Sequence, residues 1–193
     1  MIRVVLATHN AHKVEELTRI LGPALDGIEL VAYEGPEPVE DGDTFEANAL
    51  IKARAAAAFT GMPALADDSG ISATALGGAP GIHSARFAGT RVDADNVAKL
   101  LQELGDERDR SAWFTCAAAF VVGDEEMVEV GVWPGTVLDE PVGGGGFGYD
   151  PVFKPEGLSV SAAELRPDEK NAISHRSRAF GQLMPRVRAR LLE

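Results

Sequence analysis

The chain has 193 residues, 45% apolar and 25% charged, a composition typical of a globular protein large enough to bury a substantial core. Its formal net charge of −12 argues against non-specific nucleic-acid binding, which requires a basic surface. No apolar run is long enough to span a membrane, and the N-terminal segment is too short for a signal peptide. We therefore expect one cytoplasmic domain over residues 1–193, with its lone Cys116 buried and unreactive.

Short apolar runs alternate with amphipathic segments in the N-terminal half. Runs bounded by turn-forming or polar residues predict strands at 4–7, 28–33 and 63–67. Apolar residues that recur every three or four positions predict helices at 13–21 and 93–104, and a third helix is predicted at 44–60. The helix at 44–60 is predicted from its alanine-rich composition and a capping-box spacing at its start, and we interpret Asp43 as a helix cap.

The C-terminal half contains a hairpin signal, in which the apolar runs 112–122 and 127–133 flank a polar turn that begins at Gly123. A second capping-box spacing predicts a short helix at about 161–164. The apolar spacing then predicts a helix from about Ser174 onward, which Pro185 should kink or split. Because strands and helices mix throughout, we predict an α/β fold with a mixed sheet.

The glycine-rich segment 143–150 fits a G-x-G-x-x-G pattern, but Pro151 follows where a dinucleotide-binding helix would have to continue. We therefore reject a dinucleotide site and predict a flexible loop that presents Phe147, Tyr149 and Asp150. An aromatic ring beside glycine can stack on a nucleobase. A structural loop with a packed phenylalanine fits the sequence equally well.

Asp67 and Asp68 are adjacent at the predicted end of a buried strand and precede Ser69-Gly70. Two carboxylates there are costly unless a cation neutralises them. Mg²⁺, held by carboxylates and substrate phosphates, would do so. The alternative is a solvated turn in which Asp68-Ser69-Gly70 supplies only turn chemistry, and the pair alone does not decide between the two.

The turn at 8–13 joins a predicted strand to a helix N-terminus, where backbone N–H groups and the helix dipole attract anions. Thr8 and Asn10 add side-chain donors, and Lys13 adds a positive charge suited to phosphate. The segment lacks the Walker lysine motif, so it is not a P-loop. The alternative is an ordinary polar loop.

Two further polar clusters are candidate parts of a site. Glu40 belongs to an acidic loop and could join the Asp67-Asp68 pair, or it could simply be solvated. His175 and Arg176 lie at a predicted helix start, with Lys170 upstream, and could donate to carbonyl oxygens of a ligand. The alternative for this second cluster is a helix cap with a solvated basic face.

Taken together, six ordered motifs resemble the inosine triphosphate pyrophosphatase family, the XTP/dITP diphosphatases. The matching segments are 7–13, 44–49, 66–70, 78–87, 146–151 and 174–176. The chain departs from the common family pattern at His9, Ala47 and His83, none of which we assign to the chemistry.

The resemblance implies a long twisted mixed sheet flanked by helices, with two lobes around a central cleft, and a homodimer. It also implies Mg²⁺-dependent hydrolysis of ITP, dITP and XTP to the monophosphate and pyrophosphate. The expected partners are therefore a nucleoside triphosphate and a second copy of the chain, but neither nucleic acid nor a membrane.

By the same resemblance, Asp68 activates the attacking water, and Glu40 and Asp68 hold Mg²⁺, with Asp67 a further ligand or a supporting neighbour. The substrate-binding residues that it implies are Thr8, His9, Asn10, Ala11, His12, Lys13, Ser69, Phe147, Gly148, Tyr149, Asp150, Lys170, His175 and Arg176. Among them, Phe147 would stack on the base, while His175 and Arg176 would recognise its carbonyl.

Two alternatives remain open. One is a related pyrophosphatase of the septum-inhibitor type, although the chain lacks the Ser-Pro-Arg-Arg-like N-terminal signature of that family. The other is a nucleotide sensor that binds its ligand without turnover. The presence of both Asp67 and Asp68 argues against a sensor, because a sensor does not need a carboxylate that activates water.

Overall fold

The computed structural model describes all residues from 1 to 193. Six strands form one sheet in the order β2-β1-β3-β4-β5-β6. Their bounds are β1 Ile2–Leu6, β2 Ile28–Ala32, β3 Ala64–Ala73, β4 Ser111–Val122, β5 Glu125–Val137 and β6 Phe153–Pro155. Because β1 pairs in parallel with β2 and β3 while β5 and β6 are antiparallel, the predicted mixed sheet of an α/β fold is confirmed.

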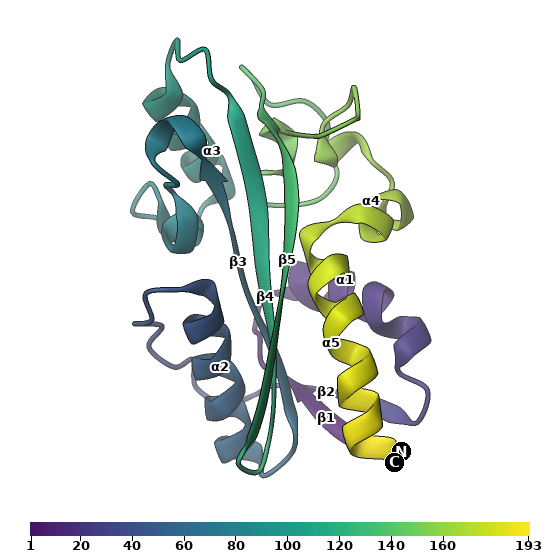
Figure 1. Cartoon of the computed structure of the whole chain (residues 1–193). Coiled ribbons are helices and arrows are strands. Elements are labelled where there is room, and N and C mark those ends of the chain that lie inside the picture. The colour runs from purple at the N-terminus through teal and green to yellow at the C-terminus, as the bar shows by residue number, and fades with distance from the viewer. The chain divides into compact units, whose positions relative to one another are not determined.

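Five α-helices accompany the sheet (Figure 1). They are α1 Ala11–Leu21, α2 Phe45–Thr60, α3 Asp93–Leu104, α4 Pro167–Ile173 and α5 His175–Leu192. Short 3₁₀ helices include η3, Gly81–Arg86, and η5, Ala162–Glu164, which begins with the predicted capping box. None of the helices combines the length and apolar character needed to cross a membrane.

The chain divides into two compact units, which agrees with the two predicted lobes. The first unit comprises residues 1–68, 116–131 and 175–193, and the second comprises 69–115 and 132–174. The long strands β3, β4 and β5 contribute residues to both units. The central cleft and the single domain over 1–193 stay predictions.

In the first unit, helices cover both faces of the strands (Figure 1). On one face, α1 and α5 place Leu17 and Phe180 against Leu65 of β3. On the other face, α2 packs through small side chains such as Ala53 against Val5. Alanine permits a close approach of helix and sheet, which explains why the predicted alanine-rich helix has a buried face.

In the second unit, α3 and an aromatic cluster form the core. Val97 and Leu100 of α3 pack with Ile71 of β3, as the predicted apolar stripe requires. Phe114 meets Phe153 edge to face, with ring centroids 4.6 Å apart. Such aromatic pairs add to the stabilisation from burial alone.

Several predicted boundaries are corrected. Helix α1 begins at Ala11 rather than at 13, with Asn10 as its N-cap. Helix α2 is capped by Thr44, so the assignment of Asp43 as its cap was wrong. Helix α5 continues through Pro185 and is not split.

The continuity of α5 has a physical reason. An interior proline costs roughly 3 kcal/mol through a lost hydrogen bond and a clash with the carbonyl four residues earlier. Phe180 and Leu183 before Pro185, and Val187 after it, are fully buried and hold both halves against the sheet. Packing therefore outweighs the local penalty.

Candidate active site

Asp67 and Asp68 lie in the middle of β3, which runs to Ala73, so both the predicted strand end and the solvated turn were wrong. Consecutive strand residues point to opposite faces of a sheet. Asp67 shares a face with Leu65, which packs with α1 and α5, whereas Asp68 shares the α2 face with Ala66. The two carboxylates are thus adjacent in sequence but have different neighbours.

Asp67 is 2% exposed and is held by two cations. Its Oδ2 lies 3.2 Å from Lys13 Nζ and 3.2 Å from Arg176 Nε. Burial alone would raise the pKa of Asp67, but Lys13, Arg176 and Lys52 outweigh burial and hold the pKa well below its usual range. Its Oδ1 is buried without a hydrogen-bond partner.

Asp68 is 9% exposed, and its charged neighbours differ from those of Asp67. Its Oδ1 lies 3.4 Å from Lys52 Nζ, which also lies 3.2 Å from Oε2 of Glu40. Burial raises the pKa of Asp68, and the charges of Lys52 and Lys13 offset this only in part. Its Oδ2 is buried and lacks a hydrogen-bond partner, so it is a strong acceptor with unused capacity.

Lys52 and Glu16 are parts of this cluster that the sequence reasoning missed. Lys52 bridges Glu40 and Asp68, and the charges of Asp68, Asp67 and Glu40 together outweigh burial and raise the pKa of Lys52. Glu16 Oε1 accepts from Nη1 of Arg176 at 3.0 Å. The available signal was position: Lys52 follows the buried Ala49 by three residues and precedes Ala56 by four, so a cation interrupts an apolar stripe.

The predicted phosphate turn connects β1 to α1. Asn10 Oδ1 accepts from the Lys13 backbone N–H at 3.2 Å, so the side chain caps the helix and occupies one of its N-terminal donors. His9 stacks on Tyr33 at 5.3 Å between ring centroids and lies 3.4 Å from Glu37. Ala11 and His12 form the exposed first turn of α1.

The remaining predicted residues of this unit are found at the start of α5. His175 is its first residue and is buried, and Arg176 follows it with its guanidinium between Glu16 and Asp67. Arg176 therefore neutralises buried carboxylates, a task that the sequence reasoning did not assign to it.

The second unit brings Phe147, Asp150 and Lys170 together. Asp150 Oδ2 accepts from the Phe147 backbone N–H at 3.0 Å and from Lys170 Nζ at 2.7 Å. Lys170 Nζ also lies 5.0 Å from the Phe147 ring centroid, a cation–π distance. The segment forms a loop without an α-helix, as predicted, and Ser69 is a half-buried residue of β3 in this unit.

Tyr149 and Gly148 complete the predicted loop. The Tyr149 hydroxyl donates to the Ser84 carbonyl at 2.6 Å, and the Gly148 N–H donates to Oδ2 of Asp93 at 2.8 Å. Burial, and secondarily the charge of Asp93, raise the pKa of Tyr149. The tyrosine is therefore a neutral donor over the physiological range.

Asp68 and Glu40 are suitable ligands for a magnesium ion. The structure contains no cluster of three or more His, Cys, Asp or Glu side chains that could bind a metal without other ligands. Mg²⁺ commonly binds one or two carboxylates and completes its shell with waters and substrate phosphates. Asp68 offers an unpartnered buried oxygen, and Glu40 lies across Lys52 from it. A dedicated cage of three carboxylates is thus not required.

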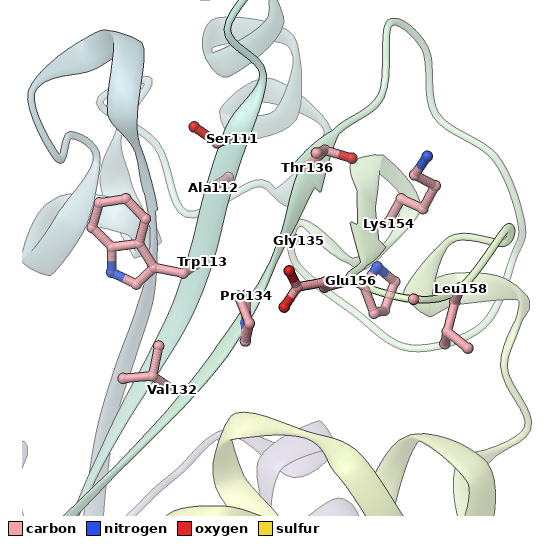
Figure 2. Close-up of a pocket in the computed structure, with 12 residues that line it drawn as sticks. Ser111, Ala112, Trp113, Val132, Pro134, Gly135, Thr136, Lys154, Glu156 and Leu158 are labelled. Carbon is pink, nitrogen blue, oxygen red and sulfur yellow. The ribbon is translucent and has the colours of Figure 1, made fainter.

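A groove of about 690 Å³ lies elsewhere in the second unit, on β4, β5 and β6. Figure 2 shows its wall of Trp113, Val132 and Pro134 beside Lys154 and Glu156. None of the predicted site residues lines it. The groove is therefore separate from the residues predicted to bind and hydrolyse the nucleotide.

Comparison with known proteins identifies the family of the chain. Residues 4–186 match the model of the Ham1 family. The chain belongs to the Ham1 family. A protein of Leifsonia xyli subsp. xyli named dITP/XTP pyrophosphatase is 58% identical, with 98% of this chain and 97% of the relative covered.

Solved structures of the Ham1 family extend the comparison to the fold. A HAM1 protein from Coxiella burnetii has a TM-score of 0.88 and 43% identity, with 97% of this chain and 98% of that chain covered. The Staphylococcus aureus Ham1 protein has a TM-score of 0.87 and 35% identity, with coverage of 97% and 99%. The predicted family, fold class and class of enzyme are confirmed.

Proposed function

We propose that this Ham1-family chain hydrolyses dITP, XTP and ITP to the nucleoside monophosphate and pyrophosphate, with Mg²⁺ as cofactor. The observation that carries the proposal is the buried Asp68, whose Oδ2 has no partner and whose Oδ1 faces Lys52. The name of the Leifsonia xyli relative, dITP/XTP pyrophosphatase, supports the substrate class.

Asp68 and Glu40 are the proposed ligands of the magnesium ion. When bound, Mg²⁺ supplies a lowered pKa for water and charge stabilisation for the phosphates. Lys52 holds both carboxylates in place and limits their repulsion.

Asp68 is the proposed general base. Its buried Oδ2 has no hydrogen-bond partner and can therefore accept a proton from a bound water. It accepts a proton from water as the water oxygen bonds to the α-phosphorus, and the bond from that phosphorus to the bridging oxygen breaks to release pyrophosphate. Asp67, paired with Lys13 and Arg176, supports the charge balance.

The turn from Thr8 to Lys13 is the proposed triphosphate-binding segment of the first unit. It combines the N-terminus of α1 with the ammonium of Lys13. In the second unit, Ser69 and Lys170 are proposed to assist. Preorganised donors of this kind stabilise the charge that develops during phosphoryl transfer.

Base selection is proposed to depend on hydrogen bonding. Hypoxanthine and xanthine have a six-position carbonyl where adenine has an amino group, so donors from His175 and Arg176 suit the first two. Adenine would place its own amino donor against these donors, a mismatch that can lower kcat/KM by several powers of ten. Phe147 would stack on the base, and Gly148, Tyr149 and Asp150 would complete the loop.

The homodimer and the cytoplasmic location remain predictions.

The test is pyrophosphate release from ITP, XTP, dITP, GTP, ATP and dTTP, each with and without Mg²⁺. We expect strong Mg²⁺-dependent release from the first three and little from the others. The six-position carbonyl accounts for the exclusion of ATP, whereas low release from GTP is expected from the family resemblance alone. Release mainly from dTTP or GTP would instead favour the septum-inhibitor type of pyrophosphatase. Binding of ITP without release from any substrate would identify a sensor.

A further inference from the structure

Asp93 makes a contact that its place in the sequence does not explain. It is the first residue of α3, where an acidic side chain usually stabilises its own helix. Here its Oδ2 accepts from the backbone N–H of Gly148, 55 residues away in sequence. A carboxylate of α3 is thus connected to the loop that carries Phe147.

The same end of α3 is tied to the segment that holds Tyr149. Asn96 is buried and donates through Nδ2 to the Ala85 carbonyl, while its Oδ1 accepts from the Ala88 N–H. Ser84 of that segment accepts the Tyr149 hydroxyl. The loop is therefore connected to the first turn of α3 both directly, at Gly148, and indirectly, through Tyr149.

The backbone at Gly148 requires such a support. Gly148 has φ +60°, in the left-handed region, and has no side chain of its own that could restrict its backbone by packing. Glycine loses more conformational freedom on ordering than other residues, so an external hydrogen bond contributes much of its order.

We propose that Asp93 is a positioning residue that holds the loop 146–150 in the conformation in which Phe147 receives a purine base. This inference rests on the proposed function. Asp93 acts through the backbone of Gly148 and does not take part in the chemistry. Its contribution is to nucleotide binding and base discrimination.

Asp93 is the link best suited to a test because its contact is exposed, whereas the pairs Asp150–Lys170 and Tyr149–Ser84 are buried. Asp93→Ala removes the acceptor, and Asp93→Asn keeps an acceptor of the same shape. Asp95→Ala is the matched control, because it removes a carboxylate from the same helical turn that contacts Thr90 instead.

Steady-state kinetics with ITP and ATP, and amide hydrogen exchange of the segment 143–150, provide two independent readouts. For Asp93→Ala we expect the KM for ITP to rise about tenfold, kcat to change less than about twofold, and the preference for ITP over ATP to fall. Exchange in 143–150 should become faster. Asp93→Asn should restore both readouts, and Asp95→Ala should leave them near wild type.

An unchanged KM and unchanged exchange in Asp93→Ala would overturn the inference, as would an equal effect of Asp95→Ala. Asp93→Asn that is as impaired as Asp93→Ala would overturn the hydrogen-bond account. If the wild-type chain does not hydrolyse ITP, the proposed function fails. Faster exchange in Asp93→Ala would still show that Asp93 orders the loop, and ITP titration of both proteins would decide its role in binding.

Discussion

The β3 carboxylates and Asp150 are both buried acids beside lysines, yet they differ in how their oxygens are used. Asp67 and Asp68 each have a buried oxygen with no hydrogen-bond partner. Asp150 instead directs one oxygen to both the Phe147 N–H and Lys170. The first pair retains capacity for a ligand, and Asp150 organises a loop.

The comparison shows that burial of a carboxylate does not by itself indicate chemistry. A buried acid that accepts from a backbone N–H and an ammonium is a structural element. A buried acid with an unused oxygen and several nearby cations stays costly until something binds. The predictions below test this division, starting from the largest expected effect on the protein.

Asp67→Asn should strongly destabilise the first unit. Loss of this charge leaves Lys13 and Arg176 without their shared carboxylate in a buried site. Breaking a buried ion pair on one side costs about 3–5 kcal/mol. Denaturant unfolding measures the change, and Asp139→Asn is the control, because Asp139 is 95% exposed beside Arg110 and should change stability by less than about 1 kcal/mol.

The same variant has a predicted pH signature. Because the pKa of Asp67 is lowered in the folded chain, its stabilising contribution is fully present above the unfolded carboxyl pKa of about 4 and is lost as pH falls through and below that value. Asp67→Asn should therefore lose less stability than wild type on acidification from pH 6 to pH 3. Parallel curves for the two proteins would contradict the assignment.

Gly146→Ala should disturb the Asp150 loop with a smaller effect. Gly146 has φ +65°, and a Cβ there would lie 2.1 Å from Asp150 Oδ2, so the loop must shift. We expect the KM for ITP to rise about tenfold, with kcat nearly unchanged. Gly144→Ala is the matched control, since its Cβ would meet no atom within 4 Å. Equal KM values for the two variants would refute this role for the loop.

Local patterns allowed much of the fold to be predicted from the sequence. Apolar periodicity identified α1 and α3, and the turn at Gly123 identified the β4–β5 hairpin. The predicted split at Pro185 was wrong because local propensity does not include the packing of Phe180 and Val187 on either side of it, whereas the predicted kink stays a prediction. The length of β3 was underestimated because Asp67-Asp68-Ser69-Gly70 has the composition of a turn.

The site could be predicted only in part. Its motifs named Lys13, Asp68 and Arg176, but Lys52 and Glu16 were missed because both pair with residues distant in sequence. The opposite orientation of Asp67 and Asp68 follows from strand alternation, which could be applied only once the strand was known to continue through them. The different roles of Asp67 and Asp68 therefore follow from their partners in the folded chain and not from the local sequence.

The central claim is that Asp68, and not its neighbour, performs the chemistry. The most direct test is kcat for ITP and ITP binding in Asp68→Asn, with thermal unfolding as a check on folding. We predict a loss of kcat of about 10³-fold, as expected for removal of a general base, with ITP affinity within about threefold of wild type. A folded Asp68→Asn variant that retains more than about a tenth of wild-type kcat would contradict the account.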